Sequence, residues 1–515
     1  MTTLRRLAAA ASFVITATVA TINGEAYADA RSGIVAIGMT AEPVTLDPAT
    51  GFTGFDYPYL YPLYDRLVDF EPSTLELRPG IARQWSFIGP DRRILELRLR
   101  EGVKFHDGTD CDAAAVKESL LYFKSAGRRN DLDPVTDIVV KDKLTLHLVL
   151  SHEYSVLPAI LSDRAGMIVS PTALKKHGKD FARNPVGTGP FKLGSWTSGK
   201  SIDYVRFDGY SNPSGIRSNG LQFRIINSST ALVSAILAGQ VDHAFNLDPK
   251  NLPVLKAHPR IRVANEPTLF YYQLMLNLAA PPTDSVLVRQ AINMSVDRAA
   301  LAKSVLGEGV GEGPGSLPIP PSNWAHTKSV SDGVRYDPKK AKELLAKAGY
   351  PDGITLKICG TPTLGYGPDI TDIEREQMKA AGIRLETTML AGSACQQSWA
   401  SKTEFVVRQG GFTGRPDPFQ TYQNNFHSKG QNNRGNVKFP GVDEALDKVL
   451  STYPREGQKK IYDELNRMWN EYVPSVVLFY GSNVVVYAND LAGEQPNLQG
   501  KDNPSTLYFK SAVVK

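Results

Sequence analysis

One segment of the chain matches a nucleotide-binding motif letter for letter. Residues 194–201 read Gly-Ser-Trp-Thr-Ser-Gly-Lys-Ser, which fits the phosphate-loop pattern Gly-x4-Gly-Lys-Ser. That motif holds phosphate only where a buried strand leads in and a helix leads out, because backbone N–H groups and the helix N-terminus then face the anion. Ile202, Tyr204 and Phe207 instead follow in a strand-like pattern. The segment is therefore predicted to be a β-turn between two strands, and nucleotide binding is not expected.

The remaining ionisable residues form no catalytic or metal-binding pattern. The eight histidines are dispersed, and the closest pair, His147 and His152, has no further ligand at metal-binding spacing. His106 lies in a Phe-His-Asp-Gly turn, where a hydrogen-bonding role is expected. Neither His-Glu-x-x-His nor Gly-x-Ser-x-Gly occurs, and the carboxylates are scattered. We therefore expect no enzyme, no cofactor and no metal site, which disfavours a secreted hydrolase.

The three cysteines, Cys111, Cys359 and Cys395, are too few for a disulfide framework and include no Cys-x-x-Cys pair. Export, which the N-terminus indicates, permits a single bridge. Cys359 and Cys395 lie in the same region, but their spacing does not show the geometry that a bridge requires. A bridge between Cys359 and Cys395 and a pair of small buried thiols both remain open.

The elements that position these residues alternate between strands and helices, separated by Pro and Gly turns. Strict apolar alternation indicates half-buried strands, and apolar stripes at helical spacing indicate helices that pack against a core. Strands are predicted over 95–100 and 144–150, helices over 230–238, 341–348 and 461–472, a buried pair of strands around Gly481 over 476–486, and an irregular loop over 307–315.

Length and charge limit the class of protein. A chain of 515 residues exceeds what one core needs, so at least two lobes are expected. Its 42% apolar and 22% charged residues are ordinary for a globular protein. The net charge of +5 is not concentrated in a Lys/Arg block, so a nucleic-acid partner is not expected.

The N-terminus has the layout of a cleaved secretory signal. Arg5 and Arg6 precede an apolar run that ends near Ile22. Two small-x-small sites follow, Ala26-Tyr27-Ala28 and Ala28-Asp29-Ala30. An uncleaved anchor helix is the alternative, but the run is short and ends in cleavage-type residues. Residues 1–30 are therefore predicted to be a signal peptide that sends the protein to the periplasm.

Several motifs occur in an order that covers nearly the whole predicted mature chain. They are Leu46-Asp47-Pro48, Tyr64-Asp65-Arg66-Leu67, Pro79-Gly80-Ile81-Ala82, the run from Leu97 to Gly108, Pro185-Val186-Gly187-Thr188-Gly189-Pro190-Phe191, Val288-Arg289-Gln290-Ala291-Ile292-Asn293 and Tyr336-Asp337-Pro338. This ordered set resembles the family-5 extracellular solute-binding proteins, which serve importers of peptides, opines, nickel complexes and some oligosaccharides.

The resemblance implies an α/β, two-lobed periplasmic binding protein fold of type II, in the large family-5 variant with an extra subdomain in lobe I. The lobes would close on a ligand at a hinge. Lobe I would cover 31–268, with the subdomain at roughly 61–184, and lobe II would cover 269–483. Residues 484–515 would return to lobe I. The chain would cross between lobes near 265–271 and again near 480–486.

The same resemblance points to residues 408–418 as part of the ligand site. In dipeptide-binding relatives a similar stretch reads Trp-Thr-Gly-Asp, and that acid pairs with the ligand's α-ammonium group. Here Phe412-Thr413-Gly414 matches, but Arg415 replaces the acid. A guanidinium suits a carboxylate or a phosphate. Either the ligand places an anionic group there, or Asp417 binds the amine, or Arg415 pairs with Asp417 and only braces the loop.

The resemblance also implies the function and the partners. We expect the substrate-binding component of an ABC importer for peptides or peptide-like solutes, a monomer that serves membrane permease subunits and two ATPase subunits. The alternatives are a binding protein for an opine, a sugar-phosphate or an oligosaccharide, and a peptide-binding chaperone or sensor without transport. The candidate ligand-binding residues are Phe52, Thr53, Phe55, Tyr271, Tyr272, Arg408, Phe412, Thr413, Gly414, Arg415 and Asp417.

Overall fold

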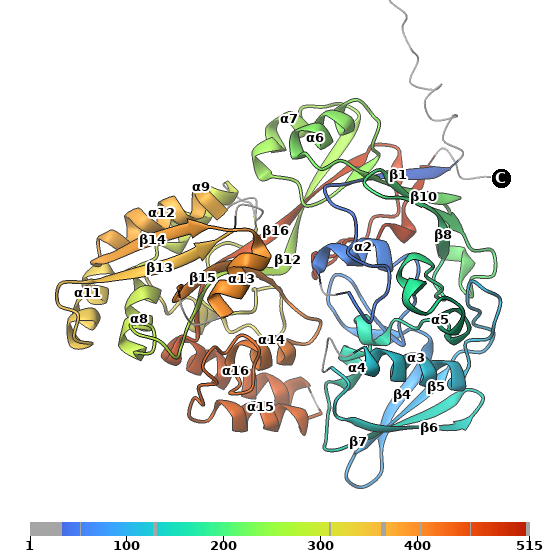
Figure 1. The fold of residues 1–515 in the computed structure, drawn as a ribbon, viewed down its shortest axis with the longest axis horizontal. Helices are drawn as coiled ribbons and strands as arrows, with labels where there is room; N and C mark the ends of the chain where they lie inside the picture. Colours follow the sequence, from blue (N-terminus) through green and yellow to red (C-terminus); the bar gives the residue numbers. More distant parts are fainter. Residues whose placement is uncertain are drawn as a thin grey trace, which may run out of the picture.

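The computed structural model shows two lobes that share one large β-sheet (Figure 1). It describes residues 33–51, 53–126, 131–307, 311–361, 367–400, 404–453 and 455–510. The predicted signal peptide at 1–30 lies outside the described residues, as does Phe52. Within the described ranges, no helix is both long and apolar enough to cross a membrane.

The large sheet has ten strands in the order β14-β13-β15-β12-β16-β11-β1-β10-β9-β8. Pairing is mixed: β1 is parallel to β10 and β11, whereas β12 is antiparallel to both β15 and β16. Its strands are β1 Ile34–Met39, β8 Phe191–Thr197, β9 Ser201–Arg206, β10 Gly220–Ile225, β11 His243–Ala244, β12 Ile261–Leu276, β13 Ile354–Gly360, β14 Ile383–Met389, β15 Val407–Thr413 and β16 Ser475–Ala488.

Strands β12 and β16 connect the two lobes, because each runs through both of them (Figure 1). The first part of β12 pairs with β16 near β11, and its last part pairs with both β16 and β15. The register shifts between Pro267 and Tyr271, where the chain passes from one lobe to the other. An irregular two-stranded ribbon of this kind can bend without breaking the sheets on either side.

The prediction of two strands around Gly481 is wrong, because residues 475–488 form the single strand β16. Gly481 lies inside that strand and causes no turn. A Cβ at this position would lie 2.9 Å from Cδ1 of Phe270 on β12. The glycine therefore admits a neighbouring aromatic ring rather than reversing the chain.

A four-stranded antiparallel sheet forms a separate layer in lobe I, in the order β4-β5-β7-β6. The alternating strands predicted at 95–100 and 144–150 are confirmed as β5 and β7. Leu95, Leu97 and Leu99 point into the core while Glu96 and Arg98 do not. The layer consists of β4 Ala82–Ile88, β5 Ile94–Leu99, β6 Val135–Asp142, β7 Thr145–Leu150 and the covering helix α3 Ala113–Ser125.

The three predicted helices are confirmed as α6, α11 and α16, and their apolar stripes face the core. Other short elements complete lobe I, and further helices cover lobe II (Figure 1). In lobe I these are α2 Tyr57–Leu60, β2 Val68–Phe70, β3 Leu77–Pro79, α4 Leu157–Ile160, α5 Pro171–His177, α6 Ser229–Leu237, α7 Leu252–Lys256, β17 Leu491–Ala492 and β18 Tyr508–Phe509. In lobe II they are α8 Val286–Met294, α9 Arg298–Leu306, α10 Lys328–Ser331, α11 Pro338–Lys347, α12 Gly367–Lys379, α13 Gly392–Ala400, α14 Pro418–Phe426, α15 Val442–Leu450 and α16 Arg455–Tyr472.

The phosphate-loop look-alike is a hairpin turn, as predicted. β8 and β9 pair antiparallel around it, and no helix follows. Gly199 adopts the left-handed conformation with φ of 69° that the turn requires. Glu42 accepts hydrogen bonds from the Gly199 N–H and the Ser198 hydroxyl. A carboxylate therefore occupies the position next to the loop amides, and this geometry does not suit a phosphate.

Helix α13 is tied to strand β13 by a disulfide. Cys359 and Cys395 are bonded, with their Cα atoms 5.7 Å apart, and this decides the alternative that the sequence left open. Cys111 is a buried free thiol.

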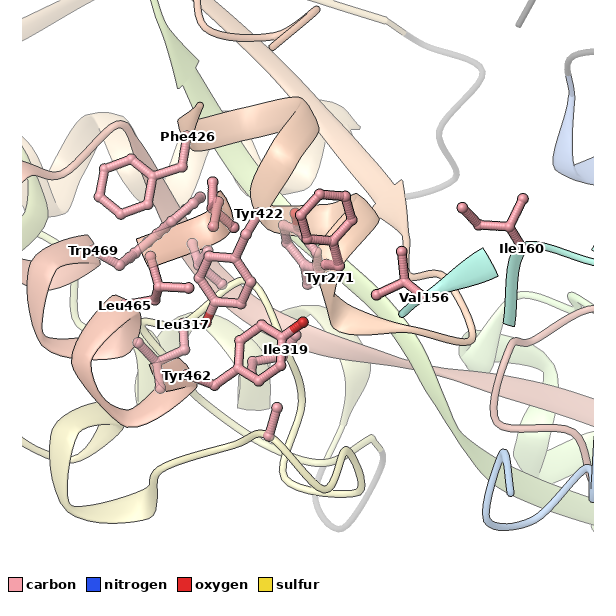
Figure 2. Close-up of a cluster of buried hydrophobic side chains, with 14 of the residues drawn as sticks. Val156, Ile160, Tyr271, Leu317, Ile319, Tyr422, Phe426, Tyr462, Leu465 and Trp469 are labelled. Carbon is pink, nitrogen blue, oxygen red and sulfur yellow. The ribbon is translucent and has the colours of Figure 1, made fainter. Parts of the chain in front are cut away.

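Apolar side chains from the lobe II helices form the largest part of the core, and lobe I residues join it. Tyr271, Tyr422, Tyr462 and Trp469 pack around one another in lobe II (Figure 2). Val156 and Ile160 approach this cluster from lobe I, at and just before α4. The two lobes are therefore in direct apolar contact in this structure.

Candidate functional site

Arg415 of lobe II reaches a carboxylate of lobe I. It follows β15, whose last residues are held against β12 because the Gly414 N–H donates to the Leu269 carbonyl at 3.1 Å. A Cβ on Gly414 would lie 2.5 Å from the Leu269 Cβ, so only glycine allows this approach. From there the Arg415 Nη1 lies 3.3 Å from the Asp163 Oδ2. This ion pair bridges the two lobes.

Asp163 is the centre of a buried polar cluster. The Tyr57 hydroxyl donates to its Oδ1, and the Lys501 Nζ lies 3.7 Å from its Oδ2. Lys501 also lies over the Tyr57 ring, 3.7 Å from the ring centroid. The Asp163 and Lys501 side chains are only 6% and 2% exposed, so these charges interact at low dielectric. Two cations, Arg415 and Lys501, thus converge on one carboxylate.

A second buried ion pair shapes the loop that ends at α2. The Arg164 Nη2 donates to the Asp56 Oδ2 at 3.1 Å and to the Thr53 carbonyl at 2.6 Å. Asp56 also accepts from the Thr53 N–H, which closes the turn. Arg164 stacks over Tyr57 as well, with its Cζ 4.2 Å from the ring centroid. The loop is therefore fixed to the same residues that carry the Asp163 cluster.

The segment that contains Lys501 is anchored by a buried histidine. The His243 Nε2 lies 2.8 Å from the Asp502 Oδ2, and its Nδ1 lies 3.0 Å from the Val486 carbonyl. Burial by itself lowers the pKa of His243, but the Asp502 carboxylate outweighs this effect and raises the pKa. This pairing fixes residue 502 to β11 and β16, and so places Lys501 beside Asp163.

The structure brings several of the candidate residues together at the lobe junction. A Cβ on Gly54, between Thr53 and Phe55, would lie 3.8 Å from the Thr413 hydroxyl, so the two loops face each other. The Phe55 side chain is 52% exposed beside them. The Phe412 and Tyr271 rings are neighbours at 5.6 Å. Thr53, Phe55 and Thr413 therefore lie at the lobe junction, whereas Tyr271 is fully buried in the lobe II core.

Tyr272 and Asp417 lie elsewhere. Tyr272 points to the other side of β12, where its ring packs against Phe270 and Phe479. Asp417 caps α14 by accepting from the Phe419 N–H at 2.8 Å, and it also accepts from the Tyr462 hydroxyl at 3.3 Å. Burial raises the pKa of Asp417 to about 6.

The brace between Arg415 and Asp417 is not formed among the described contacts. Arg415 pairs with Asp163, whereas Asp417 caps α14 and accepts from Tyr462. The alternative that Arg415 pairs with Asp417 to brace the loop is therefore wrong.

Sequence reasoning missed Asp163, Tyr57, Lys501, Arg164 and Asp56. They come from three separate segments, at residues 56–57, 163–164 and 501, and no local spacing links these segments. For Lys501 the sequence offered one indication, because this residue lies in a C-terminal segment that the resemblance assigns to lobe I. In the described part of the chain, no group of three or more His, Cys, Asp or Glu side chains could hold a metal ion.

The comparisons with known proteins show the family of the chain. The family model described as bacterial extracellular solute-binding proteins, family 5, middle region, matches residues 76–433. That span includes both sides of the Arg415–Asp163 pair. The chain belongs to this family.

Relatives of the solute-binding protein are similar over most of their length. The glutathione-binding protein GsiB of Escherichia coli O6:K15:H31 is 27% identical over 365 residues, which are 70% of each chain. The periplasmic binding protein DppA from Helicobacter pylori, solved with the peptide STSA, superposes with a TM-score of 0.80. It is 22% identical, and the alignment covers 94% of this chain and 99% of that chain.

A third similar structure is the opine-type binding protein AgaA from A. tumefacien R10, solved with agropinic acid. Its TM-score is 0.80 at 24% identity, and the alignment covers 92% of this chain and 98% of that chain. The predicted two-lobed α/β fold is confirmed by these superpositions. The solute-binding protein thus has the fold and the binding role that the ordered motifs predicted.

Proposed function

We propose that this solute-binding protein captures peptide-like solutes that carry an anionic group and delivers them to an ABC importer. The observation that carries the proposal is the cluster of Arg415, Lys501 and Asp163 where the lobes meet. Relatives support the same ligand range: GsiB is named for glutathione, and the structural neighbours hold a peptide and agropinic acid. These three ligands share carboxylate groups on a short polar chain.

The donors of Arg415 favour an anionic ligand group. Arg415 and Lys501 both lie beside the Asp163 carboxylate. The Arg415 Nε is buried and has no hydrogen-bond acceptor among the described residues, although Nη1 is engaged. A ligand carboxylate beside Arg415 would take up this unused donor. The exchange of the relatives' acid for Arg415 thus matches a change in ligand charge.

The wider organisation follows the family. Residues 31–268 and 484–515 would form lobe I, with its subdomain at roughly 61–184, and 269–483 would form lobe II. The hinge would lie where β12 and β16 cross. Residues 1–30 would direct export to the periplasm. The protein would act as a monomer, without catalysis, beside permease subunits that two ATPase subunits drive.

The direct test is native mass spectrometry of the protein purified from its host, followed by thermal-shift measurements. We expect a co-purified solute with at least one carboxylate. We also expect stabilisation by at least one of glutathione, agropinic acid and the peptide STSA. A bound solute without any anionic group would overturn the ligand class. A solute that binds in a host without genes for partner permeases would favour a sensor over an importer.

A further inference from the structure

Arg408 is a cation of lobe II, and the described part of the chain provides it with no carboxylate partner. It lies on β15, opposite Met275 of β12 and Cys359 of β13. Its Nη1 lies 3.2 Å from the Met275 sulfur, which is a weak acceptor. Its Nε is buried and has no acceptor in the described part of the chain. Burial lowers the pKa of Arg408, and no neighbouring carboxylate counteracts that effect.

The backbone in front of Arg408 leaves a space. Arg408 and Gly410 share one face of β15, because side chains alternate along a strand. A Cβ on Gly410 would meet only the Arg408 guanidinium within 4 Å, with the Cζ at 3.9 Å. By contrast, a Cβ on Gly411, on the other face, would lie 2.0 Å from the Phe270 ring. A side chain at Gly411 would therefore clash, whereas Gly410 leaves room beside a partly buried cation.

A second guanidinium with unused donors stacks on helix α13. Arg434 lies over Trp399, with its Cζ 5.1 Å from the ring centroid. Its Nε and Nη2 are buried without acceptors among the described residues. Trp399 is one helical turn beyond Cys395, whose disulfide partner Cys359 is opposite Arg408. Helix α13, which packs beside β15, therefore contacts this second cation.

We propose that the space above Gly410 is a second anion-binding subsite, in which the Arg408 guanidinium holds a carboxylate of the ligand. This inference rests on the function proposed above and adds that the ligand carries two anionic groups. A guanidinium with unused N–H donors matches a carboxylate, and the buried position makes each hydrogen bond stronger than at the surface. The open face supplies the room that such a group needs.

The two subsites are separated along the chain. Gly410 and Phe412 share one face of β15, the strand ends at Thr413, and Arg415 lies two residues beyond that end. At about 3.3 Å per residue, an extended chain spans at most roughly 17 Å from Gly410 to Arg415. Side chains that reach inward shorten this span. The ligand is therefore elongated, with anionic groups at both ends, as in short acidic peptides and peptide-like dicarboxylates.

The test is calorimetric titration of the mature protein with glutathione, agropinic acid and STSA, together with glutathione monoethyl ester, in which one carboxylate is blocked. Arg408→Gln removes the charge, and Gly410→Val fills the space but keeps the charge. We expect each variant to weaken the binding of a dicarboxylate probe at least tenfold. The control is Arg384→Gln, an exposed arginine of β14, which should bind as the wild type does.

A second measurement separates a ligand contact from a structural role. Because a buried charge without a partner is destabilising, Arg408→Gln should raise the Tm of the ligand-free protein, by about 1–2 °C, while it lowers affinity. A structural arginine would lower the Tm. The subsite is refuted if Arg408→Gln binds the probes as tightly as the wild type does while Arg415→Ala loses them. If no anionic probe binds the wild type, the function proposed above fails and the subsite fails with it.

Discussion

At the scale of single residues, the proposed preference for an anionic ligand depends on Arg415. This residue stands where the dipeptide-binding relatives place an acid, and it bridges the lobes by pairing with Asp163. Asp417, in the same loop, caps α14 instead of pairing with Arg415. The charge at position 415 therefore acts on a residue of the other lobe. Under the proposed function, this exchange changes the charge that the site prefers in its ligand.

Replacing Arg415 with Ala should weaken the binding of an anionic ligand at least tenfold, or about 1.4 kcal/mol, because the carboxylate loses a charge-assisted hydrogen bond. Calorimetry with the ligand identified by mass spectrometry measures the loss. Arg415→Lys keeps the charge but lacks the planar guanidinium, so its affinity should lie between those of the wild type and Arg415→Ala. Unchanged affinity in Arg415→Ala, with a tenfold loss in Asp417→Asn, would show instead that Asp417 binds the ligand.

Glu374 gives a residue-scale prediction about pH. It is fully buried on α12, where the Gln409 side chain donates to it, and burial raises its pKa to about 8. The folded state therefore holds a proton that the unfolded state releases near its ordinary pKa of 4.5. Folding stability should fall as pH rises between these values, by up to about 1.4 kcal/mol per pH unit, and level off above the folded pKa.

Glu374→Gln places a neutral side chain at this position at every pH, so it should abolish the loss of folding stability as the pH rises. The Tm of the variant minus that of the wild type should thus grow between pH 5 and pH 8 in scanning calorimetry. Glu376→Gln, an exposed neighbour on the same helix, is the matched control and should follow the wild type. Parallel curves for Glu374→Gln and the wild type would show that Glu374 is ionised in the folded protein.

At the scale of elements, strand β15 and the loop after it carry most of the candidate site residues. The glycines there differ in role: Gly411 and Gly414 let β12 side chains approach, whereas a Cβ on Gly410 would meet only Arg408. Helix α13, tied to β13 by the disulfide, packs beside the strand. Arg408 and Phe412 on the strand, and Arg415 just after it, therefore stand on a backbone that its neighbours hold in place.

Breaking the disulfide should make the packing of α13 on β13 less stable. The bridge between Cys359 and Cys395 closes a loop with a sequence separation of 36 residues. The chain-entropy relation assigns such a loop about 3–4 kcal/mol of stability. We expect dithiothreitol to lower the Tm of the wild type but not of the Cys359→Ala/Cys395→Ala variant. A Tm of the wild type that does not respond to full reduction would contradict this role. Cys111→Ser serves as the control, because Cys111 is not bonded.

At the scale of the whole molecule, the lobes meet through two kinds of contact. The ion pair of Arg415 with Asp163 lies at the candidate site. Further away, the Ser155 N–H donates to the Leu450 carbonyl at 2.9 Å, and Val156 and Ile160 join the lobe II core. Only the strands β12 and β16 run through both lobes within the described sheet. This construction suits closure about a two-stranded hinge.

Ligand should therefore compact the protein. We expect small-angle scattering to show a smaller radius of gyration with a saturating ligand than without it, because closure removes water from between the lobes. Arg415→Ala, which loses the bridge at the lobe junction, should compact less at the same ligand concentration. Identical dimensions of the free and bound wild type would rule out hinge closure as the binding step.

Much of this protein could be predicted from the sequence, because the deciding signals are local or ordered along the chain. Apolar alternation located β5 and β7, helical stripes located α6, α11 and α16, and the residues after Lys200 identified a hairpin rather than a phosphate loop. The ordered motifs gave the family, and the comparison of one short stretch singled out Arg415. The prediction at Gly481 was wrong because the sequence does not distinguish a glycine that makes room for an aromatic ring within a strand from a glycine that allows a turn.

Only the tertiary structure decided which partners these residues have. Asp163, Tyr57 and Lys501 come from distant parts of the chain and lie close to Arg415 only in the folded protein. Their electrostatic effect therefore depends on distances in space, which the spacing of residues along the sequence does not show. The same holds for the disulfide and for the open face above Gly410, which follow from how α13 and β12 pack on β15. Sequence fixes the kind of side chain at each position, but burial and the nearest charge, set by the fold, determine what that side chain can bind.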